Sequence, residues 1–287
     1  MHRAKAPSPW SGEGRLSVRA RAHALGLPDA LLAAIPDRPE DELPGPAIPA
    51  AGPGAPIGTV AELEMLAAGL RPAVLLHGPE PWVAGVCDWA RRRSLTAMPS
   101  AWAFLPQRDA GLGGYANLAA ARVPASGAAR EWRAVAVSAS ASLAWLLWLA
   151  EARGWDRVMG LALGYPPCCI EAFLRDWPQA VTRCAGDLGR MRLGPEGAEM
   201  PWELNVFARY AGSVLTEHFP CSWTCATSLA RARRLAGGLA RTAPALLAGI
   251  EARMRRDIAL GPDGWHPGPR HDGDRVRILV PVLQGSS

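Results

Sequence analysis

Two short strings hold four of the six cysteines in this 287-residue chain, and a proline directly precedes the first cysteine of each string. The string GYPPCCIEAF contains Cys168 and Cys169, and the string HFPCSWTCATS contains Cys221 and Cys225. Proline suits the first turn of a helix and not its interior, so each string is predicted to open a helix. Ser222 is the residue expected to cap the second of these helices.

Thiols at the start of a helix lie near backbone N–H groups that lack partners within the helix. These groups and the helix dipole favour negative charge, which lowers a thiol pKa and favours an anionic assembly of thiolates and metal. The four cysteines are therefore predicted to form one site, with Cys168, Cys169, Cys221 and Cys225 as ligands of a metal or metal cofactor.

The kind of metal is the next question. Structural zinc usually takes cysteine pairs separated by a few residues, as Cys221 and Cys225 are. The adjacent Cys168 and Cys169 fit that rule poorly, because neighbouring residues have little freedom to place both sulfurs around one small ion. A [4Fe–4S] cube has four separate iron corners, so it is the predicted cofactor. Zn²⁺, a thiol/disulfide redox pair and inert buried thiols are the alternatives.

Three polar residues near the strings are candidate catalytic groups. His218 precedes Cys221 by three residues and is a candidate proton donor or replacement ligand; a surface or capping histidine is the alternative. Tyr165 is a candidate hydroxyl donor or a packing aromatic. Glu217 is a candidate site carboxylate, although ordinary surface polarity is the expectation for the helix predicted before the second string.

Four further residues receive plainer expectations. Asn205 and Arg209, on that same predicted helix, are expected at the surface. Cys87 and Cys184 lie outside the two strings and are expected to pack in the core rather than to bind metal. Trp223, inside the second string, is expected to shield the site from water.

The strings also resemble a known signature. LGYPPCC…AF followed by H-x-PCS-x2-C-x2-S resembles that of a prokaryotic family of unknown function with LGYPxCC…PCSxxC cysteine motifs. The resemblance is at the level of motifs and covers residues from about 155 to 236. It implies that Cys168, Cys169, Cys221 and Cys225 act together, and it brings no established reaction.

The composition indicates the broad class of protein. Hydrophobic residues make up 49% of the chain and charged residues 20%, which is typical of a soluble globular protein. The net charge is +5, yet Lys5 is the only lysine and no basic block contains aromatic residues, so neither nucleic acid nor a membrane is an expected partner. The N-terminus has no apolar segment of the kind that directs secretion. A cytoplasmic location is therefore expected, where free or metal-bound thiols are more common than disulfides.

The pattern along the chain predicts three parts. Residues 1–58 contain a helical segment and a linker rich in proline and glycine. Residues 59–153 alternate strands and helices, which predicts an α/β fold with α+β as the alternative. Residues 154–287 form a mainly helical region that carries the cysteines, and a single domain formed with the second part is the alternative. Strands are expected at 72–78, 101–106, 132–139 and near 274–282, and helices at 59–70, 79–93, 140–153, 156–163, 167–176, 201–215, 222–236 and 244–258.

These observations predict an iron–sulfur protein, and an enzyme is the favoured interpretation. Its chemistry would be redox or sulfur transfer on a small-molecule substrate, with an electron donor as a candidate partner. A zinc-stabilised interaction module and a thiol/disulfide sensor are the alternatives. The sequence gives no indication of the number of subunits.

Overall fold

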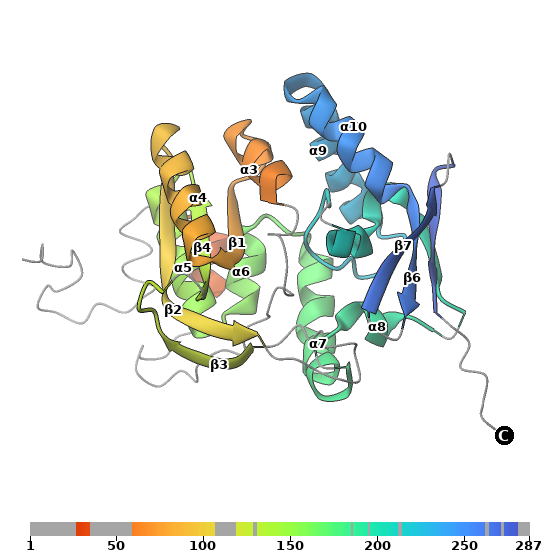
Figure 1. Cartoon of the computed structure of the whole chain (residues 1–287), viewed down its shortest axis with the longest axis horizontal. Coiled ribbons are helices and arrows are strands. Elements are labelled where there is room, and N and C mark those ends of the chain that lie inside the picture. The colour runs from red at the N-terminus through yellow and green to blue at the C-terminus, as the bar shows by residue number, and fades with distance from the viewer. Residues whose placement is uncertain are drawn as a thin grey trace, which may run out of the picture.

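The computed structural model describes residues 27–34, 59–106, 119–128, 131–184, 186–194, 196–211, 214–261, 264–270 and 273–280. Helices and two four-stranded sheets give this chain a mixed α+β fold. The two sheets lie towards opposite ends of the molecule, with α7 and α9 between them (Figure 1). The expectation of a strand–helix layer followed by a region rich in helices is confirmed.

The first sheet has the strand order β1-β4-β2-β3. Strand β4 (Trp132–Ser138) pairs antiparallel with both β1 (Ala73–Pro79) and β2 (Thr96–Pro106). Strands β1 and β2 therefore run parallel to each other, joined by helix α4 (Glu80–Arg92), with β4 inserted between them. Strand β3 (Ala119–Pro124), at the edge of the sheet, was not predicted.

Helices cover both faces of this sheet. Successive side chains of a strand point to opposite faces. Accordingly, Val74 and Leu76 of β1 pack in the cluster formed with α3 (Thr59–Ala67) and α4, whereas Ala73 and Leu75 pack against α5 (Ala141–Arg153) on the other face. The short helix α2 (Asp29–Ala34) joins the α5 side. Burial on both faces explains why these strands are continuously apolar.

The uncharged run at residues 134–150 forms most of β4 and the first ten residues of α5, as predicted. Within the described ranges, none of the helices is both long and apolar enough to cross a membrane.

The C-terminal half surrounds a second core. This half contains α7 (Pro167–Cys184), α8 (Leu188–Arg192), α9 (Ala226–Thr242) and α10 (Pro244–Met254). The helix before them, α6 (Asp156–Ala162), packs in the first core beside α5 through Val158 and Ala162. The sheet of this half has the order β5-β8-β6-β7, with bounds Ala198–Pro201 for β5, Arg275–Leu279 for β8, Arg256–Gly261 for β6 and Gly264–Arg270 for β7. Large side chains from both kinds of element fill the core, among them Met200, Phe207, Leu235, Trp265 and Ile278.

The predicted helix at 201–215 is wrong. Two short 3₁₀ helices, η3 (Trp202–Leu204) and η4 (Val206–Ala211), occupy most of this range and are separated at Asn205. The side-chain amide of Asn205 donates hydrogen bonds to the carbonyl oxygens of Met254 (2.8 Å) and Arg256 (3.1 Å). Asn205 is thus buried and ties this segment to the end of α10, so its expected surface position is wrong too.

The helix predicted at 244–258 ends early. Helix α10 stops at Met254 and the chain enters strand β6, where Ile258 pairs with Ile278 of β8. Strands β5, β6 and β7 were not predicted, whereas β8 confirms the strand expected at the end of the chain.

The proline- and glycine-rich linker lies outside the described residues, as does most of the predicted N-terminal helical segment. The division of the chain at residues 58 and 153 stays a prediction.

A buried ion cluster joins the two halves. The guanidinium of Arg71, just before β1, forms a two-point hydrogen-bonded ion pair with Glu217, which precedes the second cysteine string. The same guanidinium lies 4.0 Å from the carboxylate of Glu62 in α3. Burial and the nearby Glu217 raise the pKa of the Glu62 carboxyl from 4.5 to about 8, although Arg71 and Arg209 oppose the change.

The raised pKa of Glu62 predicts a loss of stability with increasing pH. The folded protein holds this proton up to about pH 8, whereas the unfolded chain releases it near its ordinary pKa. The folded state therefore binds more protons in this range, and its stability falls as the pH rises. Between pH 6 and pH 9 we expect the free energy of unfolding to fall by roughly 3 kcal/mol more in the wild type than in Glu62→Gln, measured by urea unfolding. Glu64→Gln on the same helix is the control, and equal pH profiles for wild type and Glu62→Gln would contradict the assignment.

Candidate metal centre

The first cysteine string begins helix α7 at Pro167, as predicted, and the helix continues beyond the predicted end at residue 176 to Cys184. The preceding turn contains Gly164 at φ 69°, a backbone conformation that favours glycine. Of the two adjacent cysteines, Cys168 is exposed and Cys169 is buried.

The second string has a different local structure from the one predicted. Helix α9 begins at Ala226, and Cys225 is its N-cap residue. Ser222 is not the cap: it lies in the loop, where its carbonyl oxygen accepts a hydrogen bond from the backbone N–H of Cys225 (3.1 Å). The Cys225 sulfur is consequently placed at the very start of α9, beside the N–H groups that have no partner in the helix.

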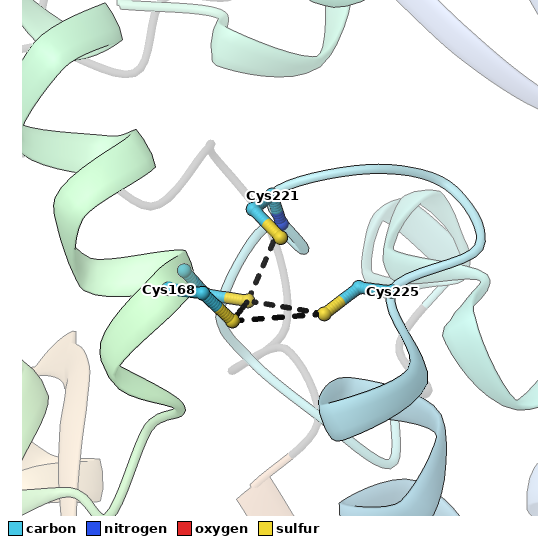
Figure 2. Close-up of side chains that lie close together, drawn as sticks. Cys168, Cys221 and Cys225 are labelled. Carbon is cyan, nitrogen blue, oxygen red and sulfur yellow. Dashed lines mark hydrogen bonds between the residues drawn. The ribbon is translucent and has the colours of Figure 1, made fainter.

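The four predicted cysteines come together. Figure 2 shows Cys168 at the start of α7 pointing towards Cys221 and Cys225 of the second string. The sulfur of Cys168 lies 3.9 Å from those of Cys169 and Cys225, and the Cys169 and Cys225 sulfurs are 3.8 Å apart. All four sulfurs lie within 4.8 Å of one another, so this group can hold a metal ion.

Ser228 connects the cysteine group to His218. It is fully buried on the first turn of α9, and its hydroxyl lies 3.1 Å from the Cys169 sulfur and 2.8 Å from Nε2 of His218. The Cys169 sulfur also accepts a hydrogen bond from the backbone N–H of Cys221 (3.3 Å). This contact of Ser228 with Cys169 and His218 was not predicted from the sequence. Its place three residues after Cys225, one helical turn away, was the signal available.

The environment moves the thiol pKa values apart. Burial raises the pKa of the Cys169 thiol well above its ordinary value, despite the hydrogen bonds from Ser228 and Cys221. Burial acts in the same direction on Cys225, but hydrogen bonds from Ser228, Cys221 and Cys169 together outweigh it and lower the pKa of that thiol to about 6. Of these two thiols, Cys225 is therefore the one that ionises first as the pH rises.

A cavity of about 220 Å³ adjoins the cysteine group. Cys169 is the one member of the group in its wall, and the three candidate catalytic residues Tyr165, Glu217 and His218 line the same cavity. The rings of Tyr165 and His218 lie 4.9 Å apart between centroids. The structure thus brings these three residues together beside the cysteines.

His218 is buried, in contrast to the surface alternative. Burial lowers the pKa of its imidazole to about 3, and the positive charges of Arg231, Arg209 and Arg71 act in the same direction. The ring is therefore neutral at physiological pH. Burial, followed by the charge of Glu217, raises the pKa of the Tyr165 phenol, which stays protonated.

The remaining polar residues have structural partners. Arg209 donates to the carbonyl oxygens of Val206 and Glu217 rather than facing solvent freely, and the Glu217 carboxylate is paired with Arg71. Trp223 is half-buried in the second core, with its ring 5.5 Å from that of Phe207.

Cys87 in α4 and Cys184 at the end of α7 are half-buried and are not members of the cysteine group.

No protein-family model, curated protein or solved structure matches this chain. The family resemblance of the cysteine strings therefore stays a prediction.

The position of Ser228 predicts a weaker metal site when its hydroxyl is removed. Loss of a group that hydrogen-bonds a metal ligand typically costs about 10-fold to 100-fold in metal affinity, and we expect this loss for Ser228→Ala. The measurement is competition for Zn²⁺ against a chromophoric chelator. Ser222→Ala in the neighbouring loop is the control, and an equal loss in both variants would show that the hydroxyl of Ser228 has no special role.

Proposed function

We propose that this protein binds one metal ion, Zn²⁺ or iron, through Cys168, Cys169, Cys221 and Cys225. The spacing of the sulfurs carries the proposal. Four thiolates around one ion with metal–sulfur bonds of about 2.3 Å form a tetrahedron whose edges are about 3.8 Å long. The three separations among Cys168, Cys169 and Cys225 are 3.8 to 3.9 Å, which supports this geometry.

The same spacing gives less support to the predicted [4Fe–4S] cluster. A cube holds its thiolates at four separate irons, so their sulfurs lie farther apart than those around one ion. Adjacent cysteines at the start of a helix also suit a single ion, because the sulfurs of Cys168 and Cys169 lie 3.9 Å apart. The cluster, and with it an enzyme of redox or sulfur-transfer chemistry, stays a prediction that metal analysis tests.

A structural ion fits the surroundings better than a catalytic one. Four thiolates leave no position open for substrate, as in structural zinc sites. Cys169 is held by two hydrogen bonds, so the exposed Cys168 is the ligand most easily displaced. Cys168 does not line the cavity, so loss of this ligand would not free a residue of the cavity wall. This arrangement supports an ion that builds the site rather than one that reacts.

The ion would connect α7, the loop at 221–225 and the start of α9. Because these thiols come together only in the folded chain, the free energy of metal binding adds to the stability of the fold. Cys169 of α7 forms part of the cavity wall, together with Tyr165 just before α7 and His218 just before the loop. The function that follows is a metal-dependent small-molecule-binding protein, in which the ion shapes the binding cavity.

Metal analysis tests the nuclearity of the site. From cells grown with ample iron and zinc and purified without oxygen, we expect about one metal ion per chain and no acid-labile sulfide. Replacement by Co²⁺ is expected to give the visible absorption of a tetrahedral cobalt thiolate. About four irons and four sulfides per chain would overturn the proposal in favour of the [4Fe–4S] cluster.

Substitution of single cysteines tests the ligand set. We expect Cys169→Ala and Cys225→Ala to lower the Zn²⁺ affinity by more than about 100-fold, the upper limit for loss of a residue that only hydrogen-bonds a ligand. Both variants should also have a lower midpoint of thermal unfolding. Cys87→Ala and Cys184→Ala are the matched controls and are expected to retain full metal content. Metal loss in Cys184→Ala with retention in Cys169→Ala would reject the assignment.

A further inference from the structure

Asp156 supplies a carboxylate without a partner to the wall of the cavity. It is the first residue of α6, and no hydrogen bond or ion pair joins its side chain to any other residue in the described part of the chain. Burial raises its pKa to about 6, so the group is mostly ionised at neutral pH. The other charged residues of the wall are engaged, Glu217 with Arg71 and Arg209 with backbone carbonyls. Asp156 is half-buried, and a partly desolvated carboxylate of this kind is stabilised when a cation pairs with it.

His218 offers a second unused group. Its Nε2 atom lies beside Ser228, whereas its buried Nδ1 has no hydrogen-bond partner among the described residues. The direction of these hydrogen bonds rests on the proposed function. A Cys169 thiolate bound to metal can only accept a hydrogen bond, so the Ser228 hydroxyl donates its hydrogen to that sulfur. The Ser228 oxygen then accepts a hydrogen bond from Nε2–H of His218. The neutral ring is then left with a lone pair on Nδ1, which can accept a hydrogen bond from a molecule in the cavity.

Aromatic side chains form another part of the wall. The rings of Phe173 and Trp177 are stacked, with centroids 5.2 Å apart and planes at 17°, and Phe219 also lines the cavity. The volume of about 220 Å³ exceeds the roughly 150 Å³ of a cavity that takes up benzene. The space therefore suits a single ring with a short side chain. Aromatic faces also attract organic cations.

We propose that this cavity binds a small aromatic amine. The ammonium group pairs with the Asp156 carboxylate, the ring lies against the wall formed by Phe173 and Trp177, and a hydroxyl on the ring donates to Nδ1 of His218. The ion pair supplies most of the affinity because it satisfies a charge that the protein leaves unpaired. The hydroxyl adds selectivity, since a buried acceptor without a donor is unfavourable.

Three probes separate these contributions: tyramine carries both groups, phenethylamine the amine alone and 4-ethylphenol the hydroxyl alone. Binding to the metal-loaded, full-length protein is measured by calorimetry, and tyramine is expected to bind most tightly. Asp156→Asn should weaken both amines by about 10-fold or more and leave 4-ethylphenol unchanged. Asp88→Asn, an exposed position on α4, is the control and should leave all three affinities unchanged.

Two substitutions separate the two nitrogens of His218. The amide nitrogen of Gln reaches the place of Nε2, so His218→Gln should keep the contact with Ser228 and the metal but lose the acceptor. Tyramine should then bind no better than phenethylamine. The shorter Asn replaces Nδ1 instead, so His218→Asn should keep the preference for tyramine while its metal affinity falls. Circular dichroism of each variant verifies that the fold is retained.

The outcomes distinguish this proposal from the metal centre. Metal-loaded protein that binds neither amine at millimolar concentration, or that binds them equally well with Asp156→Asn, overturns the amine site alone. Protein that holds no metal yet binds phenethylamine through Asp156 overturns the metal centre and leaves the amine site standing. Equal losses in Asp156→Asn and Asp88→Asn also overturn the amine site.

Discussion

The contact between the sulfurs of Cys169 and Cys225, 3.8 Å apart, fixes the start of α7 against the start of α9. Thiolates at such separations repel one another strongly when they are poorly hydrated. Without a cation, burial and the neighbouring cysteines keep the Cys169 thiol protonated, as its raised pKa indicates. A metal ion replaces that repulsion by attraction to a common centre, and the same four side chains then become a crosslink.

The two cysteine strings are also joined through Arg231. This buried residue of α9, the helix that follows the second string, donates hydrogen bonds to the carbonyl oxygens of Gly164 (2.7 Å), the first residue of the first string, and of Leu163 (3.1 Å) before it. A Cβ on Gly164 would lie 3.3 Å from the Arg231 guanidinium, in addition to the strain of a positive φ. The turn that presents Cys168 and Cys169 is therefore shaped by the helix that Cys225 caps.

The parts that the sequence predicted well are those with local causes. Prolines before the cysteines mark helix starts, and apolar runs mark strands buried on both faces, so the cysteine group and strands β1, β2 and β4 of the first sheet could be predicted. Contacts between distant segments decide the rest: Asn205 interrupts a predicted helix by binding the end of α10, and Ile258 becomes a strand residue by pairing with Ile278. The spacing of cysteines along the chain likewise does not give the distances between their sulfurs, on which the choice between one ion and a cluster depends.

The metal centre and the cavity share atoms, and this makes their occupancies dependent on each other. Cys169 is both a proposed ligand and part of the cavity wall, and Ser228 connects its sulfur to His218. A thiolate bound to metal fixes the direction of these hydrogen bonds, whereas a protonated Cys169 can donate to Ser228 and reverse them. Nδ1 of His218 would then carry the hydrogen and repel a donor in the cavity. A metal ion that fixes the hydrogen bonds in the direction from His218 to Cys169 therefore raises the affinity for molecules that donate to Nδ1. By linkage, binding of such a molecule raises the affinity for the metal ion by the same factor.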